Sequence, residues 1–174
     1  MNSLFDFIVE PCGQRYNNEV KVGDTSLIIN TELDSYKSVN NIGKVISTPL
    51  AYKTSIKPGD LVMIHHNVFR RFYDIKGKEK NSRAYFKNNL YFVQLDQIYL
   101  YKKNNKWQSF GDRCFIAPIK NNDEINASLE QSLIGILKYG NNSLEALGIT
   151  EGDLVGYKPF GEYDFVVENK RLYC

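Results

Sequence analysis

One short block occurs twice in this chain, and the repetition limits the folds that the chain can adopt. Residues 56–62 read IKPGDLV, and residues 149–155 read ITEGDLV. Two further blocks recur upstream in the same order: 42–45 (IGKV) with 134–137 (IGIL), and 7–11 (FIVEP) with 115–118 (FIAP). Three blocks in one order predict two copies of a single structural unit, 1–105 and 106–174.

The repeated Gly-Asp pair has a structural explanation. Gly59 and Gly152 supply the positive φ that a tight turn requires. Asp60 and Asp153, which follow them, can accept hydrogen bonds from nearby backbone amides. The block therefore predicts a turn between core strands and indicates no catalytic role.

Short runs of β-branched and aromatic residues, bounded by turn-forming residues, fill most of the chain. They are typical of an all-β protein, as a barrel or a sandwich. The expected strands are 5–9, 20–22, 26–30, 43–46, 61–65, 90–93 and 98–101. Residues 124–133 have apolar side chains at a four-residue spacing that suits either a helix or a loop.

The two copies differ most in the loop after the first block. Loop 12–41 separates Pro11 from Ile42, whereas the much shorter loop 119–133 separates Pro118 from Ile134. Long loops are usually either functional or disordered. We therefore expect loop 12–41 to be more extended or more mobile than its counterpart, residues 121–133.

Composition excludes several classes of protein. A net charge of +2 in a chain of mixed sign argues against binding nucleic acid by bulk electrostatics. No apolar run is long enough for a membrane helix, and Asp6 and Glu10 argue against a secretory signal, so a cytoplasmic location is expected. Cys12, Cys114 and Cys174 form an odd set without metal-ligand spacing, which favours free thiols.

The order of these blocks resembles the GroES (chaperonin-10) family, in which a G-x-V strand precedes a VGD-x-V turn. Gly43 and Val45 precede residues 59–62 (GDLV), and Gly135 precedes residues 152–155 (GDLV). The ending 165–174 resembles the family's late hairpin, and 91–99 resembles its return and closing strands. The resemblance implies two tandem GroES-like irregular β-barrel units. Neither has room for the roof hairpin, because only 47–55 and 139–148 separate the relevant strands.

The same resemblance implies a function. It implies a co-chaperonin that assembles into an oligomer and caps a GroEL-like chaperonin, with no cofactor and no metal. In that family a mobile loop between the first strand and the G-x-V strand docks through an apolar tripeptide. The matching residues here are Leu27, Ile28 and Ile29.

Two interpretations of this segment stay open. Residues 26–30 also suit a plain strand, which would make Leu27, Ile28 and Ile29 core residues instead of docking residues. The corresponding alternative function is a structural or assembly protein, for example a phage virion component, that keeps the barrel but binds no chaperonin. Under the first interpretation the protein acts in the cytoplasm, that of a bacterial host if a phage encodes it.

Two other features have ordinary explanations. Residues 74–86 are rich in charge and interleaved with aromatic residues, which suits an exposed hairpin arm better than a nucleic-acid site. His65 and His66 are adjacent on an expected strand and should face opposite sides, one half-buried and one exposed, so they cannot easily share a metal ion. No nucleophile motif, zinc motif or nucleotide-binding loop is present, and we expect no enzyme activity.

Overall fold

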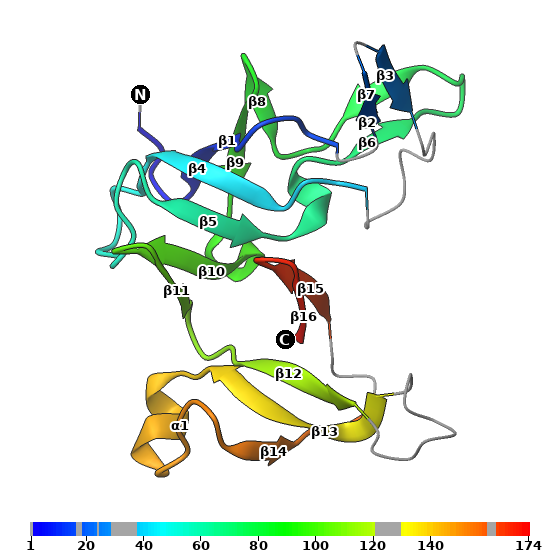
Figure 1. Cartoon of the computed structure of the whole chain (residues 1–174). Coiled ribbons are helices and arrows are strands. Elements are labelled where there is room, and N and C mark those ends of the chain that lie inside the picture. Colours follow the sequence, from blue (N-terminus) through cyan, green and yellow to red (C-terminus); the bar gives the residue numbers. More distant parts are fainter. Residues whose placement is uncertain (1, 17–18, 24, 29–37, 121–129, 160–162) are drawn as a thin grey trace. The chain divides into compact units, whose positions relative to one another are not determined.

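The computed structural model describes residues 2–16, 19–23, 25–28, 38–120, 130–159 and 163–174 (Figure 1). The regular structure of the described residues is mostly β-strand, and the chain divides into two compact units, Met1–Lys106 and Trp107–Cys174. The repeated blocks gave the expected units as 1–105 and 106–174. None of the helices among the described residues is long and apolar enough to span a membrane.

The first unit is built on an antiparallel sheet with the strand order β11-β10-β5-β4-β1-β9-β8. Its strands are β1 (Phe7–Pro11), β4 (Ile42–Ser47), β5 (Leu61–Ile64), β8 (Tyr85–Lys87), β9 (Leu90–Val93), β10 (Ile98–Lys103) and β11 (Lys106–Ser109). β11 contains the boundary between the units. Two short 3-10 helices, η1 (His66–Val68) and η2 (Leu95–Gln97), follow β5 and β9. The core of this unit includes the fully buried side chains of Phe7, Val62, Phe69, Tyr91 and Leu100.

The second unit is a five-stranded sheet with the order β14-β13-β12-β16-β15. Its strands are β12 (Phe115–Lys120), β13 (Glu130–Tyr139), β14 (Leu154–Gly156), β15 (Asp164–Val167) and β16 (Lys170–Tyr173). A short helix, α1 (Asn142–Ala146), connects β13 to β14. Phe115, Leu137, Phe165 and Leu172 form the buried centre of this unit.

Five neighbouring strands of the first sheet repeat the five strands of the second sheet. The order β8-β9-β1-β4-β5 in the first unit corresponds to β15-β16-β12-β13-β14 in the second. Pro11 pairs with Gly43 and Pro118 with Gly135, and the pairing register shifts just after Ile8 and just after Phe115. The repeated blocks therefore occupy equivalent positions. Within the first block, the pairing makes Ile8, and not Phe7, the counterpart of Phe115, which shifts the expected alignment by one position.

The repeated turn is confirmed in both copies. Gly59 has φ +95° and Gly152 has φ +99°, a conformation that side chains disfavour. A carboxylate oxygen of Asp60 accepts a hydrogen bond from the Lys57 amide at 2.8 Å, and Asp153 does the same for Thr150 at 2.6 Å.

The glycines of the upstream block are required by close strand packing. A Cβ atom at Gly43 would collide with a methyl group of Val9, and one at Gly135 would collide with a methyl group of Ile116. Val9 and Ile116 are equivalent residues of β1 and β12. The same steric limit therefore explains the same glycine in both copies.

Two expectations need correction. The sheets are open, not closed barrels: they end at β11 and β8 in the first unit and at β14 and β15 in the second. β8 and β14 have three residues each, which leaves little backbone for the pairing that closes a barrel. Of the helix or loop expected at 124–133, residues 130–133 belong to β13, where Glu130 pairs with Lys120, and residues 124–129 lie outside the described residues.

Candidate partner-binding site

The five strands that the two sheets share differ in two of their connections, and in both cases the first unit has the longer connection. Residues 12–41 connect β1 to β4, whereas the much shorter segment 121–129 connects β12 to β13. Residues 65–84 connect β5 to β8, whereas the short segment 157–163 connects β14 to β15. Since the sheet itself is common to both copies, these insertions mark where the first unit has gained something beyond the scaffold.

The first insertion contains a β-hairpin that is separate from the main sheet. β2 (Glu19–Val22) pairs with β3 (Thr25–Ile28), in a register that places Glu19 opposite Ile28. Leu27 and Ile28 are therefore strand residues, paired with β2 in a two-stranded sheet of their own. Ile29 lies outside the described residues, and so do residues 17–18, 24 and 30–37 of this loop and residues 121–129 of its counterpart, so the expected difference in mobility stays a prediction.

The second insertion forms a hairpin arm, residues 71–81. β6 (Arg71–Tyr73) pairs with β7 (Glu79–Asn81), with Tyr73 opposite Glu79. A carboxylate oxygen of Asp74 accepts hydrogen bonds from the amides of Lys76 and Lys78, both at 2.9 Å, which shapes the tip. The expected arm extended to residue 86, but Tyr85 and Phe86 belong to β8 of the main sheet.

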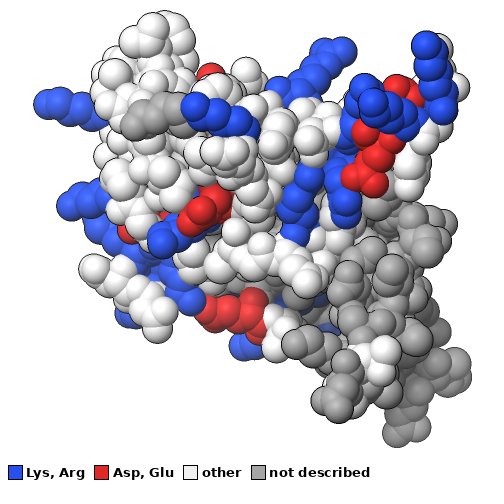
Figure 2. Space-filling model, turned by 90° about the horizontal axis from the view of Figure 1, so that it is seen from above, with Lys and Arg blue, Asp and Glu red and all other residues white. Residues whose placement is uncertain are grey.

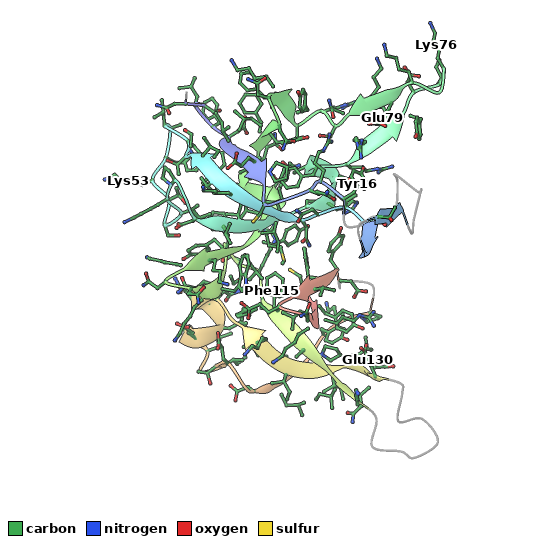
Figure 3. The ribbon with its side chains drawn as sticks, turned by 45° about the horizontal axis from the view of Figure 1, so that its top comes forward. Tyr16, Lys53, Lys76, Glu79, Phe115 and Glu130 are labelled. Carbon is green, nitrogen blue, oxygen red and sulfur yellow. The ribbon has the colours of Figure 1, made fainter. Side chains whose placement is uncertain are left out.

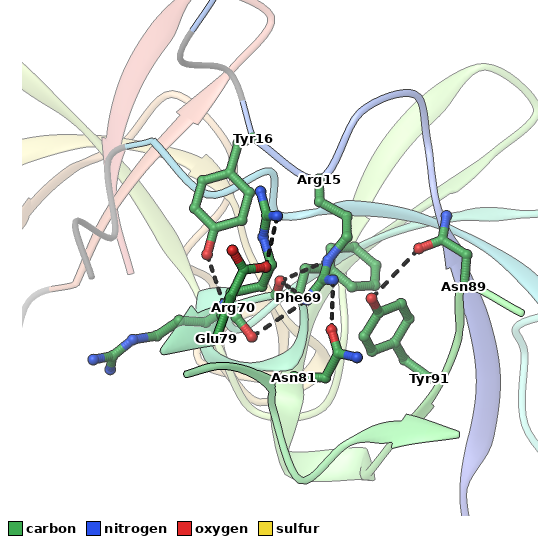
Figure 4. A network of polar contacts seen from close by, with 9 residues as sticks. Arg15, Tyr16, Phe69, Arg70, Glu79, Asn81, Asn89 and Tyr91 are labelled. Atoms are coloured by element: carbon green, nitrogen blue, oxygen red, sulfur yellow. Dashed lines mark hydrogen bonds and ion pairs between the residues drawn. The ribbon is translucent and has the colours of Figure 1, made fainter. Parts of the chain in front are cut away.

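Arg15 joins the two insertions at their base (Figure 4). Its Nε and one terminal nitrogen donate to the carbonyl oxygen of Phe69, at 3.0 and 2.7 Å. Its other terminal nitrogen donates to the side-chain oxygen of Asn81, in β7, at 2.7 Å. The guanidinium also lies over the ring of Tyr91, 5.2 Å from the ring centre. One side chain from the first insertion thus holds both ends of the second.

Tyr16 adds a second link between the same segments. Its buried hydroxyl accepts a hydrogen bond from the Arg71 amide at 2.6 Å, and the Arg71 guanidinium lies 4.7 Å from the centre of its ring. Glu79 forms an ion pair with Arg71 at 2.8 Å. Arg15, Tyr16, Arg71, Glu79 and Asn81 are hereafter called the root.

The far end of the first insertion is held at the same place. Tyr16 forms a β-bridge with Val39, and the Asn40 amide donates to the Arg15 carbonyl at 2.8 Å. The buried Asn40 side chain donates to the carbonyls of Cys12 and Gln14, at 3.0 and 2.8 Å. Both insertions therefore leave the sheet from one fixed base.

The electrostatics of the root suit a structural role. Burial lowers the pKa of Arg15, but a guanidinium stays protonated in proteins, and here its charge is held by carbonyl oxygens and an aromatic ring. Burial raises the pKa of the neighbouring Tyr91, whose hydroxyl therefore also keeps its proton. Arg15 and Tyr91 thus position the insertions without exchanging protons near neutral pH.

A groove lies beside the arm. Its volume is about 440 Å³, and it is lined by Asn67, Arg70, Phe72, Tyr73 and Ser82. Ser82 donates a hydrogen bond to the Val68 carbonyl at 2.5 Å, which fixes one wall of the groove. Aromatic and basic side chains here adjoin the exposed surface of the arm.

His65 and His66 do not face opposite sides, contrary to the expectation. β5 ends at Ile64, and His66 begins η1, so the two rings stack with their centres 4.4 Å apart. Both residues are half-buried. Burial, with a smaller effect from His65 and Arg70, lowers the pKa of His66 to about 4. Among the described residues, no group of three or more His, Cys, Asp or Glu side chains could hold a metal ion.

The three cysteines are free thiols, as expected. Cys12 is exposed, whereas Cys114 and Cys174 are half-buried. Burial raises the pKa of Cys174 to about 11, which keeps the thiol protonated and unreactive near neutral pH.

The sequence indicated the long first loop and a hairpin arm near residues 74–86, but not the root. Arg15 is 54 residues from Phe69 and 66 from Asn81, so no local pattern links them. Comparisons with protein-family models, with curated proteins and with solved structures find no match to this chain.

Proposed function

We propose that this protein is a co-chaperonin-like binding protein, which assembles into an oligomer and caps or modulates a GroEL-like chaperonin. The observation that carries the proposal is the first insertion. It occupies the place where the family resemblance puts the docking loop, and the second unit has a much shorter connection at the equivalent place. The hairpin in it is separate from the main sheet and contains Leu27 and Ile28.

The energetics of such docking are favourable on simple grounds. Each large aliphatic side chain contributes roughly 1.5–3 kcal/mol when it is fully buried in a partner's groove. A segment already paired as a hairpin loses less conformational entropy on binding than a fully flexible one. Docking by Leu27, Ile28 and Ile29 would need no cofactor and no bond-making chemistry.

A second candidate function is a structural or assembly protein, and an exposed apolar patch favours it. Leu4, Phe5 and Leu50 are 62%, 65% and 63% exposed. Backbone hydrogen bonds from Leu50 to Ser3, at 3.1 Å, and from Ala51 to Leu4, at 2.9 Å, hold these side chains on one fixed surface. A fixed apolar patch suits a permanent subunit contact.

The test combines a mass measurement in solution with a binding measurement. We expect an oligomer by light scattering, and retention of the purified chain on an immobilised bacterial double-ring chaperonin when nucleotide is present. Oligomer formation without chaperonin binding would support the assembly protein and reject the co-chaperonin. A monomer that binds no chaperonin would reject both.

A further inference from the structure

Positive charge is concentrated around the arm. Residues 70–87 contain seven Lys and Arg against two Asp and Glu, whereas the rest of the chain contains 15 against 18. The segment is therefore net +5 and the remainder net −3. In the view from above, the long basic side chains of the arm stand out at the right, around a few acidic atoms (Figure 2).

Both acidic residues of this segment are occupied within the arm. Asp74 accepts the tip amides and lies 3.9 Å from the Lys80 ammonium, and Glu79 pairs with Arg71. Lys76 and Lys78 form no ion pair with any other described residue, although both backbone amides are fixed by Asp74. The outer end of the arm thus presents uncompensated positive charge.

The same end of the arm exposes apolar side chains. Ile75, between Asp74 and Lys76, is fully exposed, and Tyr73 and Phe72 are 57% and 39% exposed. The tip cannot collapse to cover Ile75, because hydrogen bonds between Asp74 and Lys78, at 2.9 Å, and between Gly77 and Asp74, at 2.8 Å, close it. An exposed aliphatic side chain next to Lys76 and Lys78 is suited to an apolar pocket whose rim carries carboxylates.

We infer that the arm is a second docking element, which contacts an acidic surface bordering an apolar pocket on the same partner that the first insertion binds. The inference rests on the proposed function and adds the chemistry of a second site. A protein surface fits better than a single-stranded nucleic acid, because the most exposed apolar side chain of the arm, Ile75, has no ring on which a base can stack.

The root gives a physical reason why both hairpins would engage one partner. Arg15 and Tyr16 fix the first insertion to the backbone of the arm at Phe69 and Arg71. Once one hairpin has bound, the other is held near the partner at a high effective concentration. Two contacts that are weak alone can then give one stable complex.

The experiment measures the affinity of the labelled full chain for a purified bacterial double-ring chaperonin with nucleotide, by fluorescence anisotropy at several salt concentrations. The test variant is Lys76→Glu/Lys78→Glu. The matched control is Lys53→Glu/Lys57→Glu, which makes the same change in net charge at exposed positions. Lys53 and Lys76 lie at opposite ends of the first unit (Figure 3).

We expect the arm variant to bind roughly tenfold more weakly at low salt, and the control to stay within about twofold of the wild type. The wild-type affinity should fall as the salt rises from about 50 to about 500 mM, and that of the arm variant should fall less. Ile75→Ser should also weaken binding by roughly tenfold while keeping the salt dependence of the wild type.

Three outcomes would overturn the inference. If the wild type does not bind the chaperonin, the proposed function fails and the inference fails with it. If the wild type binds the chaperonin, but the arm variants bind it as tightly as the control variant does, the second docking element alone is refuted. If the wild type binds a labelled single-stranded oligonucleotide more tightly than the chaperonin, and Lys76→Glu/Lys78→Glu loses the binding to the oligonucleotide, the arm is a nucleic-acid contact.

Discussion

Replacing Arg15 with Ala should loosen both insertions at once. The change removes two hydrogen bonds to the Phe69 carbonyl, a longer one to the Arg70 carbonyl at 3.4 Å, one to Asn81 and the contact with the Tyr91 ring. The Phe69 carbonyl is part-buried, so it would lose a charged donor without full access to water. The bond to Asn81 is exposed and should contribute little.

The size of the effect follows from these contacts. Hydrogen bonds to charged groups contribute about 1.5–3 kcal/mol each when buried, and partial exposure reduces that value. We therefore expect Arg15→Ala to lower the free energy of unfolding of the first unit by about 2–3 kcal/mol. For a unit of this size, the Tm should fall by roughly 8–20 °C.

Urea unfolding would give the change in stability, and hydrogen exchange would locate it. The Arg71 amide, which donates to Tyr16, and the Asn40 amide, which donates to the Arg15 carbonyl, should lose protection, whereas the amides of β4 should not. Arg15→Lys should fall between Ala and wild type, because it keeps the charge but not the fork. Arg83→Ala, at an exposed arginine near the arm, is the control and should change stability by less than about 0.5 kcal/mol. An Arg15→Ala protein as stable as this control would refute the role given to the root.

Three further predictions concern the scaffold, the docking hairpin and the histidine pair. Gly43→Ala and Gly135→Ala should each destabilise their own unit by about 1–3 kcal/mol, because the added methyl group meets Val9 or Ile116. Thermal melting that shows no loss of stability for either variant would refute the shared steric limit. Ile28→Asp should abolish chaperonin binding without changing the melting temperature, because β3 is separate from the main sheet; a protein that unfolds instead would place Ile28 in the core. His66, whose pKa is lowered to about 4, takes up a proton more readily when unfolded, so its contribution to stability is full above about pH 6.5 and is lost as the pH falls toward 4. His66→Gln should therefore lose less stability than the wild type over that range, and equal losses in urea unfolding would contradict the lowered pKa.

The repeated blocks predicted the core of the fold because they coincide with its most constrained contacts. Gly43 and Gly135 lie where two strands pack too closely for a side chain, and the Gly-Asp pairs form the turns that follow. The expected alignment of the first block differs from the structure by one position, because 7–11 (FIVEP) has one residue more than 115–118 (FIAP) and the strand pairing aligns the two prolines instead of the two phenylalanines. Helix α1, which the expected strands and turns do not include, has a signal in the sequence: Asn141 caps it by accepting a hydrogen bond from the Leu144 amide, and Gly148 follows it with φ +78°.

What could not be predicted depends on contacts between distant residues. The family resemblance suggested closed barrels. The open edges of the sheets depend instead on the length and twist of whole strands, which no short motif reveals. The stacking of His65 and His66 depends on β5 ending one residue earlier than expected. The contact between Tyr16 and Arg71 joins residues 55 apart, and neither belongs to a repeated block.

The matching registers of the two sheets create a problem during folding, since β5 and β14 could each pair with the wrong copy. Gly43 pairs with Val62 and Gly135 with Val155, and both β5 and β14 begin with Leu-Val, so side chains give little discrimination. The lengths of the connections do discriminate. Correct pairing closes only the short connections 48–60 and 140–153, whereas pairing of β5 with β13 must close the far longer segment 65–129. Because closing a short loop costs less entropy and happens sooner, each strand finds its own copy first, and these connections protect the tandem chain against swapped pairing.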